Sequence, residues 1–183
     1  MKTENLQEWI GKTEERSDLL NAFPANAMAA TLNHEQLDYS ENKNLPPLWH
    51  WLYFLPIFRL SEAGYDGHAA LGDFLPPVQL PRRMWAGSRI EFLSPLKVGN
   101  EYKKKSKIKD VTAKSGRSGD LVFVTVSHEV SNGSTICINE EHDIVYREKA
   151  TSSSGPAKLI EAPKDFDFSI DINPDPVLLF RYS

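Results

Sequence analysis

The stretch LVFVTVSHEV, from Leu121 to Val130, decides the fold because two kinds of side chain alternate along it. One set of positions carries valines and His128, and the other carries leucine, phenylalanine and polar residues. Such a run, rich in β-branched residues, is typical of a β-strand with two different faces. Asn132-Gly133 follows and predicts a tight hairpin turn, because both residues tolerate a positive φ angle.

Three more strands are predicted around this one. The hairpin leads into a second strand over residues 135–147, and earlier strands are predicted at 101–112 and near 85–93. The glycine-punctuated segment KSGRSG at 114–119 is typical of a turn between two of them. The sequence therefore predicts a four-stranded antiparallel meander with short connections.

The N-terminal part predicts helices and an irregular segment. A short helix is expected around Leu6 and Trp9, and a second one runs from Pro24 in its first turn to Leu32. Residues 45–81 combine aromatic side chains with several prolines and glycines. We expect about two helical turns over residues 49–55, and we expect the whole segment to lie along a groove rather than in solvent.

The C-terminal part predicts a linker followed by another strand and another helix. Residues 149–165 have the composition of a linker, and residues 166–172 alternate like a strand. The apolar run from Val177 to Phe180 then follows two prolines and predicts the start of a helix. We therefore expect one domain over residues 1–148, a linker at 149–165, and in residues 166–183 either an incomplete second repeat or a tail packed on the first domain.

Composition excludes several classes of protein. Of the 183 residues 40% are hydrophobic, enough for a core, and the formal net charge of −4 argues against a nucleic-acid partner. The single cysteine, Cys137, excludes an internal disulfide and a multi-cysteine zinc site. We see neither a signal peptide nor a segment that would cross a membrane, and we expect a cytoplasmic protein without a membrane partner.

Several motifs together resemble a known family. They are PLWHWLYFLP at 47–56, the pair Gly67-His68, FLPPVQLPRRMWAG at 74–87, KSGRSGDLVFVTV at 114–126 and DIVYRE at 143–148. They are similar to the N-terminal half of MaoC-like dehydratases with a FAS1-type dehydratase domain, in the branch of mesaconyl-C4-CoA hydratase and HTD2-like proteins. The resemblance spans roughly residues 8–183.

This resemblance implies an α+β hot-dog fold, in which an antiparallel sheet wraps around a helix. Similar proteins are usually double hot dogs that hydrate or dehydrate acyl-CoA thioesters. Their N-terminal half shapes the substrate tunnel, and their C-terminal half carries a catalytic histidine with an Asp or Asn partner. Since the segment ending at Ser183 is similar to the lead-in to that motif, the resemblance places the motif itself outside this chain.

The resemblance thus implies the acyl-CoA-binding half of a hydratase or dehydratase. Its partners would be an acyl-CoA, as substrate rather than cofactor, and a second MaoC-type unit in a homodimer or in a heterodimer with a catalytic chain. The alternative is a non-catalytic acyl-CoA-binding or assembly module, including a truncated remnant.

Hydration of an enoyl thioester needs a base for water and an acid for the α-carbon, so the histidines are the catalytic candidates. His50 between two tryptophans and His68 after a glycine could each reach a groove, although each could equally be structural. His128 on the valine face is expected in a core or an interface. His142 is expected at a solvated strand end, with Glu140 on its side of the strand. No histidine has an orienting Asp or Asn at a helical spacing, and we find no metal-binding pattern.

The candidate binding residues are mostly cationic or aromatic. Arg82 and Arg83 beside Trp85 could pair with a phosphate or carboxylate and stack on a ring; the alternative is an ion pair next to a core tryptophan. Trp49 is expected in the core or the groove wall, where it could line an acyl tunnel.

The basic turn and a basic strand are the last candidates. Lys114 and Arg117 could contact a CoA phosphate, or belong simply to a hairpin turn. The lysines at 103, 105, 107 and 109 share one strand face, which predicts a solvated or protected sheet edge.

Overall fold

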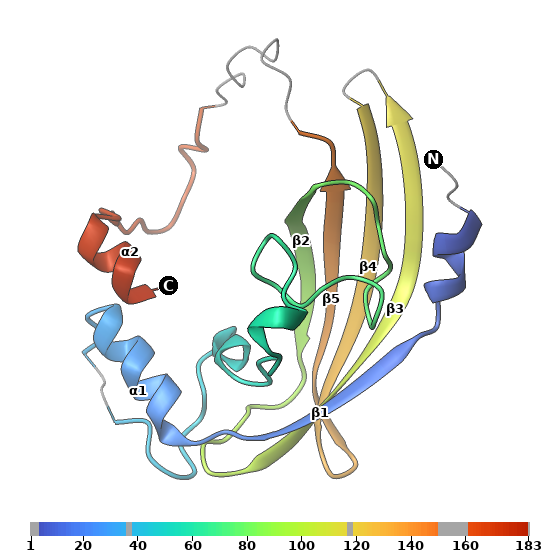
Figure 1. The fold of residues 1–183 in the computed structure, drawn as a ribbon. Helices are drawn as coiled ribbons and strands as arrows, with labels where there is room; N and C mark the ends of the chain where they lie inside the picture. Colours follow the sequence, from blue (N-terminus) through green and yellow to red (C-terminus); the bar gives the residue numbers. More distant parts are fainter. Residues whose placement is uncertain (1–3, 36–37, 117–118, 150–160, 183) are drawn as a thin grey trace.

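The computed structural model describes residues 4–35, 38–116, 119–149 and 161–182. It contains one five-stranded antiparallel sheet with strand order β1-β3-β4-β5-β2 (Figure 1). The strands are β1 (Thr13–Leu19), β2 (Arg82–Phe92), β3 (Glu101–Gly116), β4 (Gly119–Asn132) and β5 (Thr135–Arg147). The four predicted strands are confirmed, and β1 is added to them. The predicted meander is wrong for β2, because β2 pairs with β5 and not with β3, the next strand along the chain.

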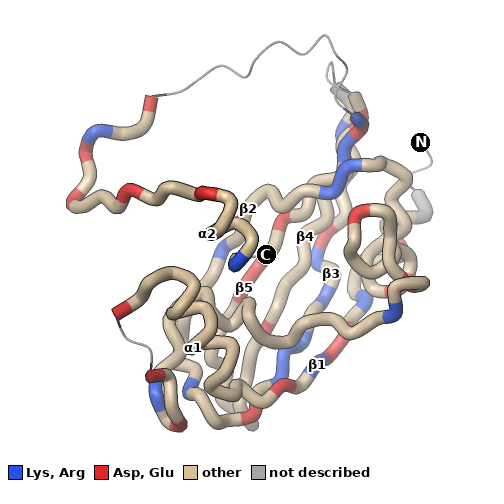
Figure 2. The backbone as a smooth tube through the Cα atoms, turned by 60° about the vertical axis from the view of Figure 1, so that its left-hand side comes forward, with Lys and Arg blue, Asp and Glu red and all other residues tan. Residues whose placement is uncertain are grey.

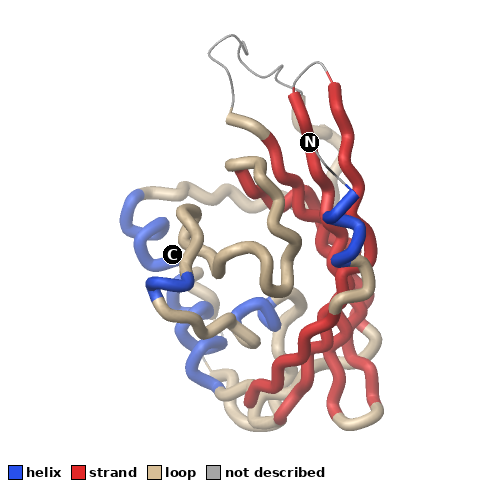
Figure 3. Tube along the Cα trace, turned by 45° about the vertical axis from the view of Figure 1, so that its right-hand side comes forward, coloured by secondary structure: helices blue, strands red, loops and turns tan. Residues whose placement is uncertain are grey.

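Helices and irregular segments cover the sheet. The α-helices are α1 (Ala22–Thr31) and α2 (Pro176–Tyr182), and the 3-10 helices are η1 (Glu4–Trp9), η2 (Trp49–Leu52) and η3 (Leu60–Glu62). Figures 1 and 3 show α1, α2 and η2 on the same side of the sheet, which we call its inner side. The α+β class is confirmed.

The start of α1 follows from its sequence. The Asn21 side chain accepts a hydrogen bond from the backbone N–H of Phe23, as an N-cap residue does. Pro24 lies in the first turn, as predicted, where its missing N–H costs little. Ala25 and Ala29, four residues apart, are both fully buried, so α1 packs through a face of small side chains.

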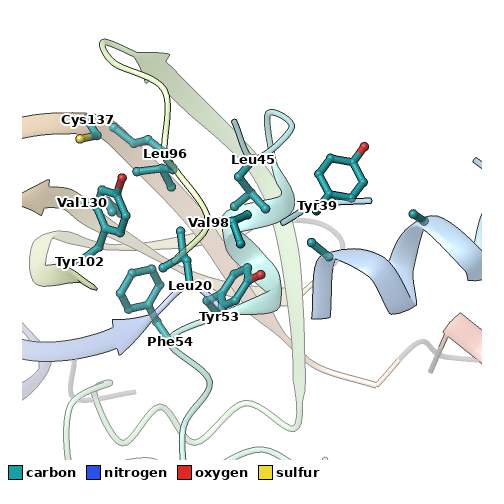
Figure 4. Close-up of a cluster of buried hydrophobic side chains, with 13 residues drawn as sticks. Leu20, Tyr39, Leu45, Tyr53, Phe54, Leu96, Val98, Tyr102, Val130 and Cys137 are labelled. Carbon is teal, nitrogen blue, oxygen red and sulfur yellow. The ribbon is translucent and has the colours of Figure 1, made fainter. Parts of the chain in front are cut away.

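The apolar core has two parts. The first surrounds the start of α1 and includes Leu20, Tyr53 and Val130 (Figure 4). The second includes Val126 and Tyr146 and lies farther along the sheet. Burial of each large side chain contributes about 1.5–3 kcal/mol relative to exposure. Since β4 contributes to both parts, the residue between them on the inner face, His128, marks a break in the core.

A β-bulge sets the register of β4 against β5. At the hairpin, where Gly133 has a φ angle of 56°, Asn132 pairs with Thr135. The register then shifts, and Cys137 is the extra residue on β5. Beyond the bulge His128 pairs with Glu140, so the two side chains lie on the same face of the sheet.

Three further structural expectations are wrong. The lysine-bearing strand β3 is not a sheet edge, because β1 pairs with it on one side and β4 on the other. Residues 166–172 form no strand, and their apolar side chains are exposed because no strand pairs with them. The predicted turns at 49–55 shrink to η2, since the chain is extended at Tyr53.

The helix predicted after the last prolines is present as α2, which lies beside α1 (Figure 1). Most of the predicted linker lies outside the described residues, so the division into a domain, a linker and a repeat or tail stays a prediction. No helix among the described residues has the length and apolar character needed to span a membrane.

Candidate functional site

A row of polar side chains crosses the inner face of the sheet between the two parts of the core. Ser106 on β3 pairs with His128 on β4, and His128 pairs with Glu140 on β5. Ser106 and Glu140 are buried, with 1% and 4% of their surfaces exposed. Burying polar groups without partners is costly, so this buried polar row is a candidate functional site.

Glu140 is the centre of a hydrogen-bonded cluster. Its carboxylate accepts hydrogen bonds from Nε2 of His50 at 3.0 Å and from Nε1 of Trp51 at 3.0 Å. Nε2 of His142 contacts Oε1, the oxygen that also accepts from Trp51. Burial alone would raise the pKa of Glu140, but the hydrogen bonds and charges of the two histidines lower it well below its usual value.

The segment that supplies His50 and Trp51 is held in a strained conformation. Leu48, just before η2, has a φ angle of 71°, and Phe54, just after it, has a φ angle of 57°. Left-handed backbone is unfavourable for such residues by about 1–2 kcal/mol each. Strain of this kind persists where surrounding contacts fix the chain, and here it brackets the two donors to Glu140.

His128 completes the row as a neutral hydrogen-bonding group. Its Nδ1 lies 2.9 Å from the hydroxyl of Ser106, and its ring centre lies 4.9 Å from that of His142. Burial, and then the positive charge of Lys104, lower the pKa of His128 to about 3. His128 is therefore uncharged at neutral pH.

A cleft of about 280 Å³ opens above this row. Its floor is formed by the sheet and includes Lys104, His128 and His142. Its roof is the irregular segment after η2, which contributes Phe54 and Leu75 among other side chains. A polar floor under a largely apolar roof is what a site for a small acyl group with a polar end requires.

His142 is the member of the cluster that can do acid–base chemistry in the cleft. Its side chain is 26% exposed, and Nε2 is held against the buried carboxylate of Glu140. A carboxylate behind an imidazole orients it and fixes its tautomer, as in other acid–base sites. The expectation that His142 lies at a solvated strand end is wrong, because it lies mid-strand on β5 above the core.

The sequence shows no orienting Asp or Asn at a helical spacing from a histidine, and in the structure a glutamate on a strand takes that place. Glu140 approaches His142 along one strand and His50 across 90 positions of the chain. In the sequence, the polar row is marked by His128, which interrupts the alternating valines of β4. Trp51 was missed, since nothing local marks its indole as a donor to Glu140.

The predicted candidates fall in different places. His68 and Arg83 line the cleft, and Arg83 forms an ion pair with Asp66 at 2.8 Å. Arg82 is exposed at the start of β2 and does not line this cleft. Trp85 is 63% exposed, and its indole N–H donates to the hydroxyl of Ser88.

Trp49 packs in the core near α1, with its ring centre 5.1 Å from that of Tyr39, so it does not line this cleft. Lys114 is exposed and lies over the ring of Phe123. Arg117 lies outside the described residues. The roles predicted for these side chains in substrate binding stay predictions.

A larger hollow of about 640 Å³ lies on the other face of the sheet. Its walls include Lys105, Lys107 and Glu141, and Figure 2 shows basic residues along β3 and acidic residues along β5. Among the charged side chains there, Arg89 and Glu141 form an ion pair across the strands at 2.9 Å. Within the described part of the chain, no group of three or more acidic, histidine or cysteine side chains has the arrangement of a metal site.

Comparison with known proteins identifies the family. Residues 48–183 match the family described as hydroxyacyl-thioester dehydratase type 2. The chain belongs to this family. It is 42% identical over 183 residues to mesaconyl-C(4)-CoA hydratase of Chloroflexus aurantiacus, and the match covers 100% of this chain and 65% of that protein.

Solved structures confirm the hot-dog fold. One chain of the ChsH1–ChsH2 complex of Mycobacterium tuberculosis superposes with a TM-score of 0.60 at 14% identity, covering 86% of this chain and 96% of that one. A MaoC-like dehydratase from Phytophthora capsici gives a TM-score of 0.50 at 16% identity, covering 92% of this chain and 58% of that one. The fold and family implied by the sequence motifs are therefore both confirmed.

Proposed function

We propose that this chain is the acyl-thioester-binding unit of a hydratase or dehydratase, and that a second MaoC-type unit supplies the catalytic histidine motif. The observation that carries the proposal is the cleft between the polar row and the apolar roof. His128 and His142 give its floor polar groups, and Phe54 and Leu75 give its roof apolar surface. Such a site suits a short acyl group with a polar end.

Membership of the hydroxyacyl-thioester dehydratase family supports the substrate class. The relative from Chloroflexus aurantiacus is named as a hydratase of a CoA thioester, and this chain spans 65% of its length. The activity of the whole relative would then need the part that this chain does not match.

The edge of the sheet offers a place for the second unit. β2 is an edge strand, with β5 as its only neighbour among the described strands. Trp85 and Phe92 on β2 are 63% and 47% exposed. An uncovered strand edge with large apolar side chains is a template for pairing with another strand. In this proposal the second unit covers that edge.

One observation favours a second candidate function, in which this chain catalyses hydration alone. His142 faces the cleft and is oriented by Glu140, so it could take a proton from water. The two candidates differ in whether activity needs another unit and in whether it depends on His142.

The test compares hydration of crotonyl-CoA and mesaconyl-C4-CoA by two proteins. One is this chain alone, and the other is this chain fused to the part of the Chloroflexus relative that it does not span. We expect turnover only from the fusion, with the intact relative as the positive control. Brisk hydration by the isolated chain, lost in His142→Asn, would establish the second candidate and contradict the first.

A further inference from the structure

Lys104 occupies an unusual position on the inner face of the sheet. It lies on β3, where it pairs in register with Arg16 on β1 and with Val130 on β4. Its side chain is half-buried and lines the cleft together with His128. The neighbouring lysines at 103 and 105 point to the opposite, solvent-exposed face of the sheet.

The ammonium group of Lys104 has no anionic partner among the described residues. Its nearest described interaction is with the ring of Phe54, whose centre lies 5.4 Å from Nζ. Lys103, by contrast, forms an ion pair with Glu15 at 3.2 Å. A half-buried charge without a partner is unfavourable, and burial followed by the charge of Arg16 lowers the pKa of Lys104.

The nearby carboxylates do not form an ion pair with Lys104. Glu14 is bound to Arg16 at 3.1 Å, and Glu140 is bound to His50 at 3.0 Å. Asp73, on the roof of the cleft, carries another carboxylate but forms no ion pair with Lys104. An anion that entered the cleft would therefore find a donor that the protein leaves unpaired.

The surroundings of Lys104 narrow the chemistry of that anion. Phe54, Leu75 and Ile144 line the same cleft, so it favours an anion that carries a hydrocarbon part. The volume of about 280 Å³ suits a short acyl group. A carboxylate at the end of a short hydrocarbon meets both conditions, since it can accept hydrogen bonds from an ammonium group.

We propose that Lys104 binds a free carboxylate on the acyl group of the thioester, so that the cleft selects acyl-CoAs derived from dicarboxylic acids. The proposal rests on the proposed function, because it assumes that the acyl group enters this cleft. It adds a determinant of specificity on the binding unit itself.

The experiment measures binding of two thioesters to the full chain by calorimetry. Mesaconyl-C4-CoA carries a free carboxylate, and crotonyl-CoA does not. We expect Lys104→Met to weaken mesaconyl-C4-CoA binding by about 10- to 100-fold, as for loss of a charged hydrogen bond, and to change crotonyl-CoA binding less than about twofold. Lys103→Met, on the other face, is the matched control and should change neither.

The two thioesters separate failure of this proposal from failure of the proposed function. An equal effect of Lys104→Met on both thioesters, or no effect on either, would overturn the carboxylate site while leaving acyl-CoA binding intact. Absence of binding of both thioesters to the wild-type chain would contradict the proposed function and this proposal with it.

Thermal unfolding of the ligand-free protein gives a second readout. Removing an unpaired charge from a half-buried site should leave the melting temperature of Lys104→Met unchanged or raise it. A clear decrease, absent in Lys103→Met and abolished when Asp73→Asn is already present, would show that Asp73 is the partner of Lys104. That result would also overturn the proposal.

Discussion

Glu140 and Glu141 are neighbours on β5, but they belong to two different environments. Glu140 points to the inner face, is 4% exposed and is bound by His50, Trp51 and His142. Glu141 points to the outer face, where Arg89 and Lys109 contact it in solvent. Both carboxylates have a lowered pKa, but the imidazoles of His142 and His50 cause it in one case and the exposed cations Lys109 and Arg89 in the other.

The difference shows why the two faces have different roles. Exposed ion pairs contribute little, because water already solvates both charges. A buried carboxylate must be fully satisfied, so its donors and their backbone are held in place. The inner face is therefore rigid enough to present His142 to a ligand, and the outer face is a solvated surface.

The largest expected effect comes from breaking the inner cluster. Glu140→Ala leaves the Nε1 hydrogen of Trp51 and the Nε2 of His50 without their buried partner. We expect a loss of about 3–5 kcal/mol in the free energy of unfolding, measured by urea denaturation. Glu141→Ala is the matched control one residue away, with an expected loss of about 1 kcal/mol or less. Equal losses in the two variants would contradict the contrast between the faces.

A smaller effect is expected in the dependence of stability on pH. The pKa of His128 is lowered to about 3 in the folded protein, against an ordinary value of about 6.5. Between these values the unfolded chain binds a proton that the folded chain excludes, so stability is lost as the pH falls from about 6.5 towards 3. The resulting loss in the free energy of unfolding approaches about 1.4 kcal/mol for each pH unit.

His128→Asn should remove this contribution, because asparagine does not titrate. Urea denaturation of the wild type and the variant between pH 7 and pH 5 isolates the effect of His128 from that of Glu140, whose lowered pKa acts only in more acidic solution. An unchanged slope in His128→Asn would mean that folding does not lower the pKa of His128, and it would contradict a neutral, buried His128.

The smallest effect is expected on the outer face. Arg89 pairs with Glu141 and Asp143, but its side chain is 58% exposed. Arg89→Ala should leave the midpoint of urea denaturation unchanged within error, and added salt should not separate the variant from the wild type. A loss as large as that of Glu140→Ala would show that the outer ion pairs are structural.

Local patterns in the sequence were sufficient for the strands β2 to β5 and for α1, but they did not show that β2 pairs with β5 across the chain. The alternation in β4, the Asn132-Gly133 turn and the proline in the first turn of α1 each act over a few residues. β1 was not predicted, because TEERSDL is polar and becomes a strand only by pairing with β3.

The site depended on features that local patterns do not contain. Without the bulge at Cys137, the hairpin register would place His128 opposite Asn139 instead of Glu140, because a shift of one residue exchanges the two faces. The contact between His50 and Glu140 joins a strained segment to a strand far along the chain. The family resemblance predicted the fold and the class of chemistry, but it marked neither Glu140 nor Lys104.

The central claim is that the acyl group of a thioester binds above the polar row. The most direct test is NMR of the chain with selectively labelled histidines, of which the sequence has five. We expect crotonyl-CoA, and not CoA alone, to shift the ring signals of His142 and His128 while the exposed His34 stays unchanged. Saturating crotonyl-CoA that leaves His142 and His128 unshifted would contradict the claim.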